Sequence, residues 1–286
     1  MEHGETSMSQ ESNGAHAHYA ATGILERIRA ALAALGPQDR PLTPRELGAM
    51  DQFHTRGHAA TAELAELAGI GPGDRVLDLG CGIGGPARLI AQSRGCRVTG
   101  VDLSEGFVEA ARYLSLRTGQ QDRVEFHCAS ALELGFADAS FDVVLLQHVA
   151  MNIAQRDRLY REIRRLLAPG GRFATYDVLR GRGEPHYPAP WAREAGDSFL
   201  LDAASTRQAV EAAGLRVLAW RDDTQAAREW AAQLKAAAAA APSGPATPGL
   251  GVVMGPDFPL LAGNHARNLL EGRVEVLMAV FEAARA

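Results

Sequence analysis

A glycine-rich run at residues 76–85, with the sequence VLDLGCGIGG, separates an expected strand from an expected helix. Glycine adopts positive φ without strain and lets the backbone approach a ligand closely, so such a loop can cradle a cofactor. Asp102 ends the next expected strand, where a carboxylate can accept hydrogen bonds from ribose hydroxyls. Together they predict a nucleoside-containing cofactor; the competing interpretation is a set of glycines that only forms a tight turn.

Asp78 narrows the chemistry of that cofactor. A carboxylate just before the glycines is poorly placed for a pyrophosphate and well placed for an ammonium group. The loop also lacks the third glycine of the dinucleotide fingerprint at its usual offset, and Pro86 opens the helix. We therefore expect a cofactor with an amino-acid end and no phosphates. An NAD-dependent oxidoreductase is the competing hypothesis.

Two polar side chains follow the strand expected at residues 141–146, near the edge where parallel strands present ligands. His148 fits a contact to the second substrate or a general base, and equally a histidine that orders its own loop. Asn152 fits a substrate carboxylate or hydroxyl, and equally the cap of a helix that begins near Ala154.

Aromatic residues form a third group, in and beside a Gly/Pro-rich loop at residues 181–190. His186, Tyr187 and Trp191 could enclose a developing cation with their aromatic faces. Packing of a lid explains Trp191 at least as well.

These residues need a scaffold, and alternating strand and helix patterns between residues 75 and 178 supply it. The alternation predicts βαβ units, a parallel sheet and right-handed crossovers. Strands are expected at residues 75–79, 97–101, 124–128, 141–146 and 172–178, with helices at 86–94, 105–118 and 154–167.

The flanking regions read as helices with one further strand. Helices are expected at residues 19–35, 59–68, 205–213, 224–241 and 259–270, and a strand at 215–221. Residues 274–283 fit a closing strand or a helix, and residues 242–255 form a low-complexity connector. We divide the chain into a disordered tail (1–15), a helical cap (16–70), a cofactor-binding core (71–222), and a helical lid with the connector and a C-terminal element (223–286).

Composition excludes several classes of function. The chain has 286 residues, 47% hydrophobic residues and a net charge of −5, so nothing predicts nucleic-acid binding. No run is apolar enough to span a membrane, and the N-terminus is unlike a signal peptide. The three cysteines lack metal-type spacing, which predicts reduced thiols, no metal site and a cytoplasmic protein. Cys81 is best explained by packing.

Four segments in order resemble motifs of class I S-adenosylmethionine-dependent methyltransferases. They are the glycine run, residues 101–104, residues 141–144 with Gln147 and His148, and the turn at residues 166–171. The resemblance implies a Rossmann-like α/β fold with a mostly parallel seven-stranded sheet and helices on both faces. It also implies N-terminal helices, a helical insertion before the last strand, and S-adenosylmethionine as the cofactor.

The same resemblance implies roles for individual residues. Asp102 would hold the ribose and Leu103 would lie beside the adenine, whereas Ser130 stands where the family often has an acidic residue. Adenine recognition would then rest on the Ser130 hydroxyl and the amide of Ala131. The full set of expected cofactor-binding residues is Asp78, Gly80, Gly82, Asp102, Leu103, Ser130, Ala131 and Gln147.

Outside the core the chain resembles sarcosine/dimethylglycine N-methyltransferases and related quinone and sulfonium-forming enzymes. The matching stretches are residues 51–57, 147–153, 185–191 and 268–273. The N-terminal region often closes over the cofactor in this family, which adds Tyr19, His54 and Arg56 to the candidates. The expected catalytic residues are His148, Tyr19, Tyr187 and Asn152, and the expected substrate-binding residues are His54, Arg56, His186 and Trp191.

The resemblance predicts methyl transfer to nitrogen or sulfur of a small, amino-acid-like metabolite. In-line displacement mainly requires alignment of the acceptor with the methyl group. The alternative is an O- or C-methyltransferase acting on a quinone or natural product, which apolar lining around residues 185–200 and 250–260 would favour. The expected partner is a small-molecule methyl acceptor, without nucleic acid or membrane; a homodimer is compatible with the sequence.

Overall fold

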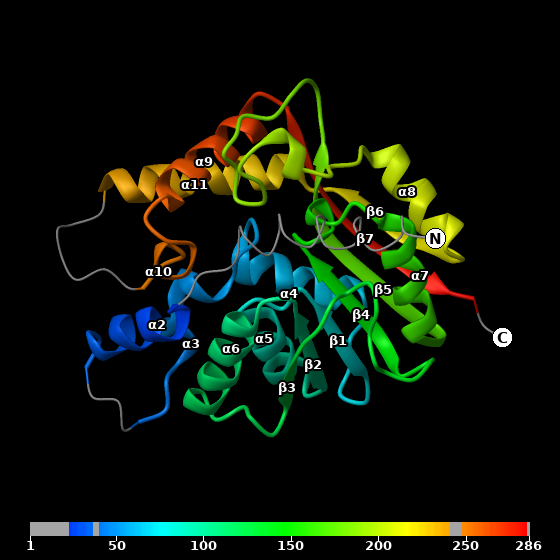
Figure 1. Ribbon diagram of the computed structural model, residues 1–286, viewed down its shortest axis with the longest axis horizontal. Helices are drawn as coiled ribbons and strands as arrows, with labels where there is room; N and C mark the ends of the chain where they lie inside the picture. The colour runs from blue at the N-terminus through cyan, green and yellow to red at the C-terminus, as the bar shows by residue number, and fades with distance from the viewer. Residues whose placement is uncertain (1–22, 37–39, 241–247, 285–286) are drawn as a thin grey trace, which may run out of the picture.

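A seven-stranded sheet with the order β3-β2-β1-β4-β5-β7-β6 forms the centre of the computed structural model, which describes residues 23–36, 40–240 and 248–284 (Figure 1). The first five strands pair in parallel, whereas β7 runs antiparallel to β5 and β6. The predicted mostly parallel sheet of a Rossmann-like fold is therefore confirmed. The strands are β1 (Arg75–Leu79), β2 (Arg97–Asp102), β3 (Val124–Cys128), β4 (Phe141–Gln147), β5 (Leu167–Arg180), β6 (Leu215–Asp222) and β7 (Val274–Ala283).

Helices cover both faces because successive strand residues point in opposite directions. Val76 packs in a cluster with residues of α4 (Gly57–Leu67), α5 (Gly85–Arg94) and α6 (Glu105–Arg117). Its neighbour Leu77 packs in a second cluster with residues of α7 (Arg156–Leu166) and α8 (Ala203–Ala212).

Two expectations change in the sheet. The fifth strand begins at Leu167 instead of residue 172, because Leu167 pairs with Phe141 before the register shifts. The segment that fitted a strand or a helix is the strand β7, which is buried along almost its whole length between β5 and β6. Burial on both faces explains its near-continuous apolar sequence, which has no clear period of two.

An N-terminal group of short elements packs beside α6. It consists of α2 (Ile24–Ala33), α3 (Pro44–Leu47) and the 3₁₀ helix η1 (Gly48–Asp51), and its core includes Ile28 and Leu32. The helix expected at residues 19–35 is thus shorter in the described part of the chain. The expected tail at residues 1–15 and Tyr19 lie outside the described residues.

The helical insertion between β6 and β7 lies across the carboxyl ends of the sheet strands (Figure 1). It contains α9 (Thr224–Ala240), α10 (Gly251–Met254) and α11 (Phe258–Leu270), and α9 packs against α11. The short helix α10 falls in the expected connector. It is held by tertiary contacts, since Arg27 Nε donates to the Val252 carbonyl at 3.0 Å and Val253 is buried. Residues 242–247 of that connector, and residue 241 before it, lie outside the described residues.

Candidate active site

A cavity of about 1440 Å³ lies between the carboxyl ends of the strands and the helical insertion. Ligands of open α/β sheets bind at this edge, and a pocket for a single ligand usually measures about 300–1,000 Å³. The cavity therefore has room for two molecules. Its wall is built from residues 52–59, the glycine loop, the ends of β2 and β4, and helices α9 and α11.

The glycine loop forms the floor of one half of the cavity. Gly80 has φ 72° and Gly82 has φ 53°, both in the left-handed region that favours glycine. A Cβ at Gly80 would lie 2.2 Å from Val149 Cγ2, and one at Gly82 would lie 3.0 Å from Phe53 Cε2. Both positions thus need glycine for conformation and for space.

Asp102 is fixed beside this loop by two backbone amides. Gly82 donates to its Oδ2 and Ser104 donates to its Oδ1, each at 2.9 Å. A carboxylate has about four lone-pair sites, so both oxygens can still accept bonds from a ligand. Leu103 is 40% exposed and lines the cavity next to Asp102, which gives an apolar surface for a flat ring.

Asp78 lies behind the glycines and does not line the cavity. It is only 1% exposed, and burial together with the nearby Asp102 raises its pKa to about 7. Its Oδ2 has no hydrogen-bond partner among the residues that the structure describes. A buried carboxylate of this kind is stabilised by a cationic group, which is the role that the ammonium hypothesis gave it.

The remaining expected cofactor residues, Ser130, Ala131 and Gln147, all line the cavity. Ser130 Oγ accepts a bond from its own loop, from the Leu132 amide at 3.2 Å. Gln147 belongs to a polar cluster that sequence reasoning missed, because its other members precede β1. Thr61 Oγ1 lies 3.1 Å from Gln147 Oε1 and 3.0 Å from Gln52 Oε1.

Two hydrogen-bond donors of that cluster have no acceptor in the described structure. One hydroxyl proton can serve only one acceptor, and the side-chain nitrogens of Gln52 and Gln147 are buried without a partner in the described structure. Both residues line the cavity, so these N–H groups can bind an anionic group such as a cofactor carboxylate.

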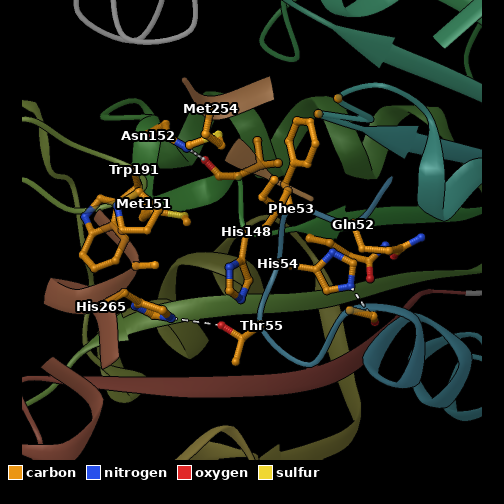
Figure 2. Close-up of a pocket in the computed structure, with 18 of the residues that line it drawn as sticks. Gln52, Phe53, His54, Thr55, His148, Met151, Asn152, Trp191, Met254 and His265 are labelled. Atoms are coloured by element: carbon orange, nitrogen blue, oxygen red, sulfur yellow. Dashed lines mark hydrogen bonds between the residues drawn. The ribbon is translucent and has the colours of Figure 1, made fainter. Parts of the chain in front are cut away.

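His148 is the centre of the other half of the cavity (Figure 2). Its ring stacks on Tyr176, with centroids 5.3 Å apart, and meets His54 edge-on at 5.9 Å. Burial, with smaller effects of His54 and His265, lowers its pKa well below 6.5. The imidazole is therefore neutral at pH 7, and its Nε2 is buried without a partner among the described residues.

His265 is a cavity residue that sequence reasoning missed. Its Nε2 lies 3.0 Å from Thr55 Oγ1, and its ring meets Trp191 edge-on at 5.6 Å (Figure 2). Burial lowers its pKa to about 4. No local pattern marks this histidine, because it comes from α11 and its partner Thr55 precedes α4.

The lining of the cavity is mostly apolar, although Thr55, Asn152 and Lys235 also contribute to it. The only carboxylates in the described lining are Asp102 and Glu133, and Glu133 is paired with Arg158 at 2.6 Å. An ammonium group in this half would therefore meet no carboxylate from the described lining. The apolar residues are Phe53, Met151, Ile153, Trp191, Phe199, Trp230, Leu234, Leu250, Met254, Phe258 and Leu270.

Two of the expected substrate-binding residues, Arg56 and His54, line the cavity but already interact with other residues of the protein. Arg56 forms ion pairs with Glu63 and, at 2.5 Å, with Asp223, so its charge is neutralised. The His54 Nε2 lies 3.1 Å from the Gly57 carbonyl, and burial lowers the pKa of this ring to about 4.

Of the loop aromatics, only Trp191 reaches the cavity. Its Nε1 donates to Ser198 Oγ at 2.9 Å, so it presents its apolar ring to a ligand. His186 instead lies 2.8 Å from Glu271 and does not line the cavity, and neither does Tyr187, which packs against the core. The structure therefore does not bring His186 and Tyr187 to the expected site.

Asn152 lines the cavity in the 3₁₀ helix η2 (Ala150–Asn152). It does not cap the following helix α7, whose N-cap position is Gln155. Its Oδ1 is buried without a partner in the described structure, which leaves it open to a donor on a ligand.

Among the described residues, no group of three or more His, Cys, Asp or Glu side chains could hold a metal ion. No described helix is both long and apolar enough to cross a membrane.

Comparison with known proteins places this site in a wider context. A family model described as a methyltransferase domain matches residues 77–175. A sterol 24-C-methyltransferase from Eremothecium gossypii is 40% identical over 166 residues, covering 56% of this chain and 44% of the relative. The 27-O-demethylrifamycin SV methyltransferase from Amycolatopsis mediterranei is 41% identical over 132 residues, covering 45% of this chain and 48% of the relative.

The likeness in structure extends further than the likeness in sequence. The crystal structure of the cyclase SpnF has a TM-score of 0.67 and 22% identity, and the match covers 93% of this chain and 98% of that chain. This comparison supports the fold alone. The chain spans only about half the length of the curated relatives that it matches.

Proposed function

We propose that the chain, whose residues 77–175 match a methyltransferase domain, uses S-adenosylmethionine to methylate a hydroxyl of a large, mostly apolar acceptor. The observation that carries this proposal is the apolar half of the cavity around a neutral His148. An amino-acid-like acceptor is less well supported, since its ammonium group would find no carboxylate in that half of the described lining and Arg56 is already neutralised.

The other half of the cavity fits S-adenosylmethionine. Asp102 would accept hydrogen bonds from the ribose, and Leu103 would lie against the adenine. Asp78 lies behind the glycines, outside the cavity lining, so it would stabilise the ammonium group electrostatically and without direct contact. When bound, S-adenosylmethionine supplies an electrophilic methyl group on a sulfonium.

The residues of the chain then orient the acceptor and accept its proton. His148 would take the proton of the hydroxyl as the hydroxyl oxygen bonds to the methyl carbon and the methyl carbon–sulfur bond breaks. The products would be an uncharged ether, S-adenosylhomocysteine and a protonated His148. Trp191 and Met151 exclude water from the reacting atoms. A low pKa makes His148 a weak base, and alignment supplies the larger part of the rate.

Carbon methylation is a second candidate, which the aromatic lining favours. Trp191, Phe199 and Trp230 could stabilise a carbocation formed when an alkene takes the methyl group. The curated relatives include both a sterol C-methyltransferase and an enzyme named for an O-methylation.

The proposal is tested by incubating the protein with S-adenosylmethionine carrying a deuterated methyl group and an organic-phase metabolite extract. We expect mass spectrometry to find a labelled methyl ether among apolar products, and less of it with Asp102→Ala, because the cofactor affinity of this variant is reduced. Label on carbon would select the second candidate. Label only in the water-soluble amino-acid fraction would overturn the proposal.

A further inference from the structure

His265 has one ring nitrogen with a hydrogen-bond partner and one without a partner among the described residues. Its Nε2 is tied to Thr55 at 3.0 Å, whereas its Nδ1 is buried without a partner among the described residues. An unsatisfied buried polar atom destabilises a protein by about 1–3 kcal/mol. A leftover nitrogen of this kind in a cavity wall is therefore a candidate for contact with a ligand.

His148 has the same property, and its ring meets that of His265 edge-on. Its Nε2 is also buried without a partner, and the centroids of the two rings are 6.4 Å apart (Figure 2). The two histidines come from different elements, the end of β4 and α11, and both line the cavity. The half of the cavity around His148, where the methyl acceptor would bind, thus has two neighbouring imidazole nitrogens in a mostly apolar wall.

A packing role alone does not account for His265. The edge-on contact with Trp191 at 5.6 Å would be kept by a phenylalanine of similar shape. A phenylalanine would also avoid burying an unpaired nitrogen. Thr55, itself buried, holds the ring in place through its hydroxyl.

We propose that His265 binds a second oxygen of the acceptor, beside the hydroxyl that His148 deprotonates. The preferred acceptors are then apolar molecules with two oxygens on neighbouring carbons, such as a diol or a hydroxyketone. With the ring centroids 6.4 Å apart, two adjacent oxygens of one acceptor can each form a hydrogen bond of about 2.8 Å to one of the two rings. This inference rests on the proposed function, because that function places the reacting hydroxyl at His148.

The test compares two probes on one skeleton, 2,3-dihydroxynaphthalene and 2-naphthol. Binding to the protein saturated with S-adenosylhomocysteine is followed by the fluorescence of the cavity tryptophans Trp191 and Trp230. We expect the diol to bind roughly 2–13-fold more tightly than the naphthol, the range for one additional hydrogen bond. Equal binding, or no binding of either probe, would overturn the inference.

Variants separate recognition from packing. His265→Phe should abolish the preference while leaving the affinity for 2-naphthol within about twofold. Thr55→Val should reduce the preference less, since the ring remains but loses its support. His186→Phe, at a histidine outside the cavity, is the matched control and should leave the preference unchanged. A His265→Phe protein that weakens both probes equally would assign His265 to packing and overturn the inference.

Failure of the proposed function would look different. In that case the diol preference and its loss in His265→Phe would persist, but no labelled methyl ether would form from any hydroxyl acceptor. Methylation of monohydroxy acceptors without a diol preference would retain the proposed function and reject the role of His265.

Discussion

The backbone amide of Gly82 donates a 2.9 Å hydrogen bond to Oδ2 of Asp102, which joins the glycine loop to the end of β2. Replacement of Asp102 by alanine removes this link and the expected ribose contact together. Affinity for S-adenosylhomocysteine should fall by about 1.5–3 kcal/mol, the scale of hydrogen bonds to a charged group. Calorimetry measures it, with the exposed Asp122→Ala as control. Unchanged affinity would remove Asp102 from the cofactor site.

Gly80 provides a test of the close approach between the loop and Val149. Gly80→Ala adds a Cβ 2.2 Å from Val149 Cγ2 at φ 72°. Gly119→Ala is the matched control, because Gly119 has φ 68° and open space around it. The control should lose about 1–2 kcal/mol of unfolding free energy from backbone strain alone. Gly80→Ala should lose clearly more in urea unfolding, and equal losses would show that Val149 moves aside freely.

His148 should govern the pH dependence of the reaction. Its lowered pKa keeps the ring neutral at pH 6.5, so kcat/KM should show no inflection there and should fall only at more acidic pH. His148→Ala should lower kcat by about 10²–10⁴-fold if the ring is the base. Recovery of most of that rate in His148→Gln would instead assign His148 to alignment. An inflection near pH 6.5 that persists in both variants would point to another group.

Asp78 should couple stability to pH. Its pKa is about 7 in the folded protein against 3.8 as the ordinary value, so the folded state holds a proton that the unfolded state loses between these pH values. The stabilisation is complete below pH 3.8 and is lost as pH rises towards 7, by up to roughly 4 kcal/mol. Asp78→Asn does not titrate.

The unfolding free energy of Asp78→Asn, measured relative to wild type in urea, should therefore rise between pH 5 and pH 7 and level off above. The comparison with wild type cancels the contributions of the other titrating groups to the unfolding free energy. Asp177 is one of these groups, because burial raises its pKa to about 7 as well. A difference that is constant across this range would mean that Asp78 is ionised throughout.

Local sequence patterns correctly predicted those strands and loops whose conformation depends mainly on neighbouring residues. The strands β1 and β3 have the expected bounds, because apolar runs between glycines and polar turns need no distant information. The glycine loop and Asp102 were also found in the sequence, since both are next to strand ends. The start of β5 was missed because Leu167 is recruited by a pairing with Phe141.

The half of the cavity around His148, where we expect the methyl acceptor, could not be predicted from local sequence patterns. Its wall comes from helices after β6 and from a segment before β1, so no spacing in the sequence reveals that Thr55 and His265 meet. Arg56 was expected to be available to a substrate, but its partner Asp223 lies 167 positions further along the chain. Side-chain roles of this kind depend on which distant residues fold together.

The position of β7 has a consequence for biosynthesis. A nascent chain leaving the ribosome delivers β5 and β6 long before the strand that pairs with both of them. Until β7 emerges, two apolar strand edges lack their neighbour, and open edges are templates for aggregation. The helices α9 to α11 are synthesised between β6 and β7. Their contribution to the cavity wall can therefore form only after β7 has joined the sheet. Chaperone demand should therefore be greatest just before β7 emerges.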